Sequence, residues 1–130
     1  MTERLSAYAP QALSVLRIIA ALLFLAHGTQ KLMGFPAAEF APPMFSIFWF
    51  AGVIEIVTGI LIGIGLFTRP AAFIASGTMA VAYWMVHAPG NIFPANNGGD
   101  AAILFCFVFL YLVFAGPGAV SLDANLRRRR

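Results

Sequence analysis

Charged residues are scarce in this chain. Only 10% of its 130 residues are Asp, Glu, Lys or Arg, and 61% are hydrophobic, whereas soluble domains carry roughly 25% charged residues. A soluble protein of this length could not bury so much apolar surface, so the solvent around it must be lipid. The composition therefore excludes an ordinary soluble globule and predicts one integral membrane domain over residues 1–130.

Cysteine pairs and cofactor motifs are also missing. Cys106 is the single cysteine and lies in an apolar run. An internal disulfide, a CxxC redox pair and a thiolate metal site are therefore excluded. Because no haem, flavin or iron–sulfur motif is present, we expect no covalently bound cofactor and no electron transfer by this chain alone.

The eight basic residues do not predict binding to nucleic acid. Half of them form the tail Arg127–Arg130, which follows an apolar segment. Such a tail is typical of a topology anchor in contact with anionic lipid head groups. We also expect no cleaved signal peptide, because Arg17 interrupts the first apolar stretch and no A-x-A site follows it.

Four apolar segments approach the ~20 residues that a helix needs to cross a bilayer. Pro10 and Pro70 suit the first turn of a helix, and Gly116-Pro117-Gly118 is a strong stop signal. The segments favour helices over membrane strands, because the runs are too long and lack polar/apolar alternation. The sequence predicts an all-α, integral membrane four-helix bundle, with helices at about 10–33, 44–67, 70–88 and 99–116.

The basic residues also predict orientation. They gather on one side of the predicted spans, at Arg4, Arg69 and Arg127–Arg130. The loops on the other side carry both signs, at Lys31, Glu39 and Asp100. The positive-inside rule then places both termini and the Thr68–Arg69 turn in the cytoplasm, and the two longer loops outside.

Ionisable groups inside a bilayer are costly and usually face the bundle interior, where they mark function. At 100° per residue, Arg17, His27 and Lys31 fall within about 80° on one face of the first helix. The ~1.5 Å rise per residue places both histidines about 25 Å from the cytoplasmic helix ends. The candidate site residues are Arg17, His27, Lys31, Glu55, Trp84, His87 and Asp100.

The direction of the side chains predicts a partner for Glu55. Helical side chains lean toward their own N-terminus, so Glu55 and His27 approach each other from antiparallel helices. Glu55–His27 is the favoured contact, and Arg17 is the second choice because its long arm can compensate.

Several interpretations of the cluster formed by the candidate site residues stay open. It suits a metal site, a proton relay or a pocket for a polar ring, although its spacing matches no metal motif and we predict no metal. It also suits a purely internal network that fixes helix register. Arg17 and Lys31 can snorkel to the interface, and Trp84 and Tyr83 can be interfacial belt aromatics.

These residues resemble the DoxX family of small membrane proteins. Arg17 with His27-Gly28-x-x-Lys31-Leu32 is similar to the family's first helix, and Glu55 with Thr58-Gly59 and Gly63-x-Gly65-Leu66-x-Thr68-Arg69 is similar to its second helix and turn. Gly98-Gly99-Asp100 resembles the opening of the fourth helix, with aspartate where glutamate is commoner. The closing motif is matched by Gly116-Pro117-Gly118 and Ser121-Leu122-Asp123. The resemblance covers nearly the whole chain and implies a four-helix membrane fold.

The resemblance implies a bacterial plasma (inner) membrane location and a redox context. Family members include a membrane subunit of an archaeal thiosulfate:quinone oxidoreductase and a subunit of a bacterial oxidant-resistance complex. The chain lacks the cysteine pair of relatives in methylamine-dehydrogenase maturation, and no residue specific for thiosulfate can be named. The leading hypothesis is therefore a multi-pass membrane subunit of a quinone-linked redox system, which requires a redox partner.

Two alternatives stay beside this hypothesis. The first is a non-catalytic assembly or stabilising subunit that binds other membrane helices, or a second copy of itself, through exposed faces. The second is a small-solute transporter, which lacks support because no discontinuous helix or inverted repeat is visible. The expected partners are membrane lipid and other membrane or redox protein subunits.

Overall fold

The computed structural model describes all residues from Met1 to Arg130 and contains helices and loops without any strand. The predicted all-α class is confirmed. The elements are α1 (Thr2–Ser6), α2 (Ala9–Met33), α3 (Ile47–Ile64), α4 (Thr68–Ala82), the π-helix η1 (Tyr83–His87), α5 (Pro94–Asn97), α6 (Asp100–Ala115) and α7 (Leu122–Arg128).

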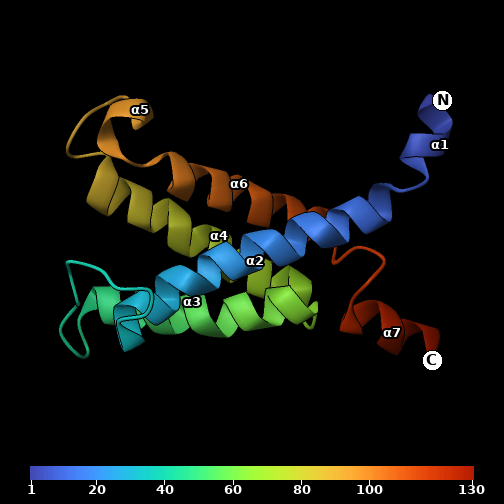
Figure 1. Cartoon of the computed structure of the whole chain (residues 1–130), viewed down its shortest axis with the longest axis horizontal. Coiled ribbons are helices and arrows are strands. Elements are labelled where there is room, and N and C mark those ends of the chain that lie inside the picture. The colour runs from blue at the N-terminus through green and yellow to red at the C-terminus, as the bar shows by residue number, and fades with distance from the viewer.

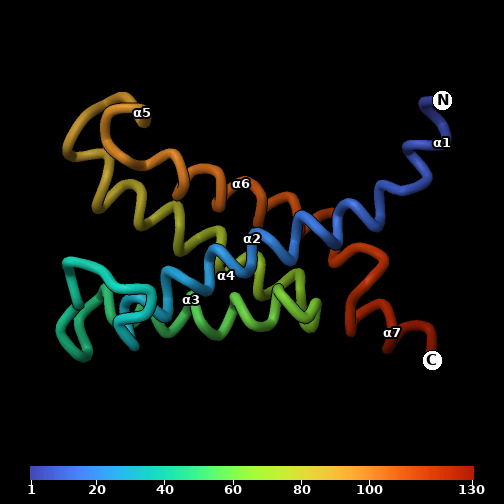
Figure 2. Tube along the Cα trace, in the orientation of Figure 1, coloured from blue at the N-terminus to red at the C-terminus, as the bar shows by residue number.

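The long helices pack as two pairs. Helix α2 lies along α3, α4 lies along α6, and α3 also contacts α4 (Figure 1). The pairs are close together near the end of the molecule that holds both termini, and they diverge toward the end that holds α5 and the loop between α2 and α3 (Figure 2). A core of fully buried side chains lies between the pairs, with Phe24 of α2 in edge-to-face contact with Phe109 of α6 at a centroid distance of 4.8 Å.

Local residue chemistry sets the helix ends. The side chain of Ser46 accepts a hydrogen bond from the backbone N–H of Trp49 at 3.3 Å, so α3 begins at Ile47 rather than at the predicted residue 44. Such a cap satisfies one of the free N–H groups of the first turn. Gly34 and Gly65 end α2 and α3 in the left-handed conformation (φ 66° and 72°), which glycine adopts without steric cost.

The third predicted helix is not a regular α-helix to its end. After α4, residues Tyr83–His87 form a π-helical turn, in which the N–H of Ala88 donates to the carbonyl of Tyr83 at 2.9 Å. The wider turn shifts the following side chains around the helix axis, and such turns occur frequently at functional sites. No local residue pattern predicts it.

The C-terminal segment folds back across the ends of the other helices. Ser121 caps the short helix α7 by accepting from the N–H of Ala124 at 3.0 Å. The carboxylate of Asp123 accepts hydrogen bonds from the N–H groups of Phe67 and Thr68, both at 3.0 Å, and therefore caps α4 from a distant part of the chain. This segment ties the α3–α4 turn to the C-terminus.

Two helices, α2 with 25 residues and α3 with 18, are long and apolar enough to cross a membrane, whereas the apolar helix α6 has only 16 residues. Many large apolar side chains point outward from all four long helices, as expected where lipid replaces water. Examples on α2, α3, α4 and α6 are Leu23, Val57, Phe73 and Phe107, which are 57%, 52%, 65% and 64% exposed.

Candidate functional site

A cavity of about 750 Å³ lies where the two helix pairs diverge. Helix α2 contributes His27 and Lys31 to it, α3 contributes Glu55, and η1 contributes His87. The remaining wall is mainly apolar and comes from α3, α4, η1, α6 and the loop between α2 and α3. Four of the seven predicted site residues therefore share one cavity.

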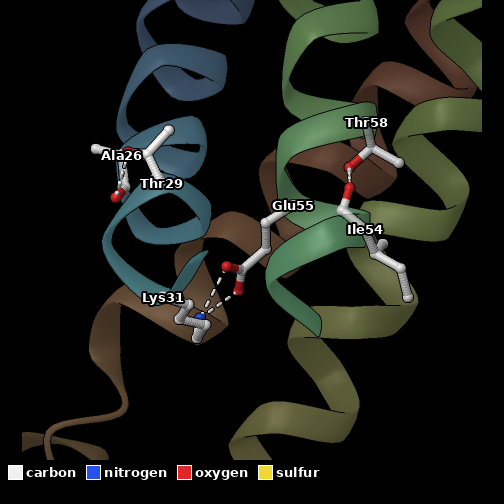
Figure 3. A network of polar contacts seen from close by, with 6 residues as sticks. All are labelled: Ala26, Thr29, Lys31, Ile54, Glu55 and Thr58. Atoms are coloured by element: carbon white, nitrogen blue, oxygen red, sulfur yellow. Dashed lines mark hydrogen bonds and ion pairs between the residues drawn. The ribbon is translucent and has the colours of Figure 1, made fainter. Parts of the chain in front are cut away.

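Glu55 forms an ion pair with Lys31 (Figure 3). The Lys31 Nζ atom donates to both carboxylate oxygens of Glu55, at 2.7 and 2.8 Å. The favoured Glu55–His27 contact and the second choice, Arg17, are thus both replaced by Lys31. Glu55 leans toward the start of α3, and Lys31 leans toward the start of antiparallel α2, so the two side chains meet one turn beyond His27.

The close packing of α2 on α3 makes this pair possible. A Cβ atom on Gly28 would lie 3.0 Å from the Cβ of Glu55, and one on Gly52 would lie 3.1 Å from the Cβ of Lys31. Small residues at such positions let helix backbones approach closely in lipid. The nearby hydroxyls of Thr29 and Thr58 bond to carbonyls of their own helices, so they do not compete for the ion pair (Figure 3).

His87 is oriented by the backbone of Asn97. Its Nδ1 atom lies 3.1 Å from the Asn97 carbonyl oxygen. Because a carbonyl can only accept, Nδ1 carries the proton, and the Nε2 atom of a neutral ring is then left as an acceptor. His27 lies against Phe105 in an edge-to-face contact, with ring centroids 6.0 Å apart.

Asn97, which the sequence did not single out, contacts the cavity residue His87 without lining the cavity itself. Its side chain donates to the hydroxyl of Tyr83 at 3.2 Å and to the Asn91 carbonyl at 3.0 Å, and it accepts from the N–H of Gly99 at 2.8 Å. Asn97 therefore connects the loop before α6 to η1. Its position directly before Gly98-Gly99 is the sequence pattern that could have predicted this role, since asparagine side chains hydrogen-bond to backbone groups two residues further along.

The glycines after Asn97 also have a structural reason. Gly98 has a φ of +71°, which favours glycine. A Cβ atom on Gly99 would lie 2.5 Å from the ring of Tyr83, so this position requires glycine for close packing.

The other three predicted residues lie outside the cavity. Arg17 is at the opposite end of α2, buried, and its guanidinium donates to the carbonyls of Pro117, Val120 (2.9 Å) and Gly63 (3.3 Å). Trp84 is 72% exposed and packs on Tyr83. Asp100 is exposed in the first turn of α6, while its neighbour Ala101 lines the cavity.

Nothing in the side-chain arrangement forms a metal centre. No group of three or more His, Cys, Asp or Glu side chains is close enough to hold an ion. Cys106 is half-buried, and Ser76 donates a hydrogen bond to its carbonyl at 2.8 Å. The cavity thus places hydrogen-bond donors and imidazole rings beside a mainly apolar wall.

Comparison with known proteins identifies related membrane proteins. The DoxX family model matches residues 12–88, which span most of α2, all of α3 and α4, and η1. The chain is 46% identical to an uncharacterized protein of Haemophilus influenzae over 130 residues, covering 93% of this chain and 95% of that protein. It is 35% identical to the inner membrane protein YphA of Escherichia coli, covering 88% and 89% of the two chains.

A more distant relative is an uncharacterized membrane protein of Mycobacterium tuberculosis. It is 29% identical over 150 residues, covering 96% of this chain and 87% of the relative. No solved structure matches the chain.

Proposed function

Because the chain belongs to the DoxX family and is a protein of the bacterial inner membrane, we propose that it is a membrane subunit of a quinone-linked redox system. On this proposal α2, α3, α4 with η1, and α6 all cross the bilayer as a four-helix bundle. Both termini face the cytoplasm, as the basic residues Arg4, Arg69 and Arg127–Arg130 favour. The cavity then lies in the outer half of the membrane.

The observation that carries the proposal is the cavity and the composition of its wall. Its volume of about 750 Å³ lies within the usual range for small-molecule sites of roughly 300–1,000 Å³. Such sites combine apolar walls with a few placed polar groups. Here the polar groups are the Lys31–Glu55 pair, His27 and His87, and the rest of the wall suits an apolar ring and its tail.

The position of the opening suits a ligand that is dissolved in lipid. Phe50 of α3, Val81 of α4 and Met85 of η1 line the cavity and are 48%, 55% and 50% exposed. This exposure is what a cavity that opens sideways between α3 and α4 would give. A quinone would enter from the bilayer without crossing water.

The polar groups supply what quinone chemistry requires of a protein. Oxidation of a quinol to a quinone releases two electrons and two protons. The ammonium of Lys31 can donate to a quinone oxygen and favour negative charge on it. The Nε2 atom of His87, which the bond to Asn97 leaves as an acceptor, can take one proton of the quinol, and His27, which also lines the cavity, can take the other. The electrons pass to a redox partner subunit.

The test is quinone binding by the purified chain and by a variant with a filled cavity. Gly77 lines the cavity, and a Cβ atom there would meet nothing within 4 Å. Gly77→Leu should therefore place an apolar side chain in the quinone space with no clash at its Cβ atom. Ile74→Phe is the matched control, because Ile74 is on the same helix, 50% exposed and outside the cavity.

Quinone extracted from the purified protein, and quinone titrated into delipidated protein, should bind to the wild type and to Ile74→Phe. Gly77→Leu should lose binding about tenfold or more, with an unchanged melting temperature. Wild-type protein that neither retains nor binds quinone would exclude the proposal, as would full binding by Gly77→Leu.

A second candidate function, assembly of a larger membrane complex, is favoured by the outer face of α6. Phe105 and Phe109 of this helix pack into the interior, stacked with centroids 5.7 Å apart. An exposed apolar stripe remains at Leu104, Phe107, Tyr111 and Phe114, which are 66%, 64%, 58% and 74% exposed. Apolar side chains spaced three, four and three residues apart form the kind of seam against which a partner helix packs. Co-purification with a partner that depends on this stripe and not on the cavity would support assembly.

A further inference from the structure

A second hollow, of about 390 Å³, lies at the opposite end of the molecule from the cavity. It is formed between the α3–α4 turn and α7, where both chain termini lie (Figure 1). Three arginines line it: Arg69 from α4, Arg127 from α7, and Arg130. A single acidic residue, Asp123, faces them.

The acidic residue does not cancel the positive charge of the hollow. Both carboxylate oxygens of Asp123 already accept hydrogen bonds from the backbone N–H groups of Phe67 and Thr68, at the start of α4. A helix N-terminus carries about half a positive charge, which offsets part of this carboxylate. Three guanidinium groups therefore remain to attract an anion.

Arg69 is held in place at this site. Its Nη1 atom donates to the carbonyls of Val113 and Phe114, both at 2.7 Å, and so caps the end of α6. The second nitrogen of the fork, Nη2, and Nε are not used by these two bonds. A guanidinium that is fixed in this way loses little freedom when it binds an anion.

Exposed apolar side chains surround the arginines. Phe67 is 64% exposed and Leu126 is 52% exposed, and both line the hollow. Leu122, one turn before Leu126 on α7, is 43% exposed. A short helix with apolar residues at i and i+4 and arginines at its end is typical of a segment that lies in the membrane interface.

From these contacts we infer that the hollow binds the phosphate of an anionic phospholipid. Arg69, Arg127 and Arg130 contact the phosphate oxygens, and the acyl chains run along Phe67 and Leu126 into the bilayer. Arginine forks match phosphate geometry, and basic pockets beside membrane helices recognise anionic head groups. The site is independent of the proposed quinone cavity.

The arginine tail itself provides a matched experiment. Arg127 and Arg130 line the hollow, whereas Arg128 and Arg129 do not, and Arg128 donates instead to the Ala119 carbonyl at 3.0 Å. Two double variants therefore remove the same charge from different places. Arg127→Gln/Arg130→Gln removes it from the hollow, and Arg128→Gln/Arg129→Gln removes it from outside the hollow. The full-length protein in detergent is titrated with phosphatidylglycerol, cardiolipin or phosphatidylcholine, and bound lipid is counted by native mass spectrometry.

The wild type should bind phosphatidylglycerol or cardiolipin more tightly than phosphatidylcholine. Arg127→Gln/Arg130→Gln should weaken that binding by about tenfold or more, and Arg128→Gln/Arg129→Gln by less than about twofold. Equal losses in the two variants would show a diffuse basic tail and overturn the site. Equal binding of phosphatidylcholine would overturn the anionic ligand. Inorganic phosphate lacks acyl chains, so displacement of the lipid by millimolar phosphate would overturn the lipid assignment.

Discussion

The ammonium of Lys31 lies 2.7 Å from one carboxylate oxygen of Glu55 and 2.8 Å from the other, but the two side chains differ in burial. The Glu55 side chain is 1% exposed and the Lys31 side chain is 28% exposed. The carboxylate is therefore enclosed between α2 and α3, while part of the lysine faces the cavity. A ligand in the cavity would meet the lysine first, and Glu55 would act on the ligand through it.

The first prediction concerns the stability of this pair. Lys31→Met should destabilise the protein by about 3–5 kcal/mol, because it leaves a buried carboxylate without its partner. Lys31→Met/Glu55→Leu should recover most of that loss, since a buried ion pair can be replaced by apolar groups at little cost. Melting temperatures in detergent measure both effects.

Measurements of quinone binding test whether the Lys31–Glu55 pair serves ligand binding or only stabilises the fold. Glu55→Gln should weaken quinone binding more than folding, because the amide still accepts a hydrogen bond from Lys31. If Glu55→Leu bound quinone normally and melted at a higher temperature than the wild type, the carboxylate would be dispensable for function.

Periodicity places His27 and Lys31 on one face of the first predicted helix, yet it does not identify the partner of Glu55. His27 and Lys31 share a face of α2 one turn apart, and both line the cavity. Whether His27 or Lys31 contacts Glu55 depends on the axial offset between α3 and α2. It also depends on the conformation of the four-carbon lysine side chain. Neither quantity is encoded in a single helix pattern.

The sequence predicts even less about Arg17 and Asp123. The wheel places Arg17 on the inner face but cannot show that the loop after α6 brings the carbonyls of Pro117 and Val120 to it. Asp123 caps α4 across more than 50 residues of chain. Contacts of this kind depend on the path of a loop, and loop paths follow from tertiary packing rather than from local propensity.

The second prediction is that Arg17 stabilises the fold and does not bind the ligand. It lies ten residues, or about 15 Å along the helix, from His27. Arg17→Met should leave buried carbonyls without donors, and each lost bond to a charged donor is worth about 1.5–3 kcal/mol. Arg17→Lys keeps the charge but lacks the planar fork, so it should be destabilised less.

Melting temperature and quinone affinity are measured on the same Arg17 variants. The melting temperature should fall, while the affinity of the remaining folded protein should stay within about twofold of the wild type. A loss of quinone affinity in folded Arg17→Lys protein would show that Arg17 contributes to the ligand site.

The third prediction is a pH effect at the α7 segment. Burial raises the pKa of Asp123, but the hydrogen bonds from Thr68 and Phe67 and the charge of Arg127 together outweigh it, so the pKa lies below its ordinary value of 3.8. A carboxyl group with a lowered pKa stabilises the fold above its ordinary pKa, and this contribution is lost as the pH falls through the folded value.

Wild type should therefore melt higher than Asp123→Asn at neutral pH, and the difference should shrink once the pH drops below about 4. Glu39→Gln is the control, since Glu39 lies exposed in the loop between α2 and α3. Its pH curve should follow that of the wild type. A melting difference between wild type and Asp123→Asn that is constant from pH 7 to pH 3 would contradict the capping role.

The last prediction concerns orientation in the membrane. Both termini lie at one end of the molecule, and the loop between α2 and α3, which carries Ala38, and helix α5, which carries Ala95, lie at the other end (Figure 1). All three positively charged regions, at Arg4, Arg69 and Arg127–Arg130, belong to the end with the termini, so this end should stay in the cytoplasm.

Single cysteines in a Cys106→Ala background test this orientation, with a maleimide that does not cross membranes. Cysteines at Ala38 and Ala95, which are exposed, should react in intact cells, and those at Thr2 and Ala124 should react only after the membrane is opened. The labels at the two loops also report where the cavity lies, because His87 and Lys31 are close in sequence to these loops. If the termini reacted in intact cells and the loops did not, the cavity would belong to the cytoplasmic half, and protons from quinol would be released inside the cell instead of outside.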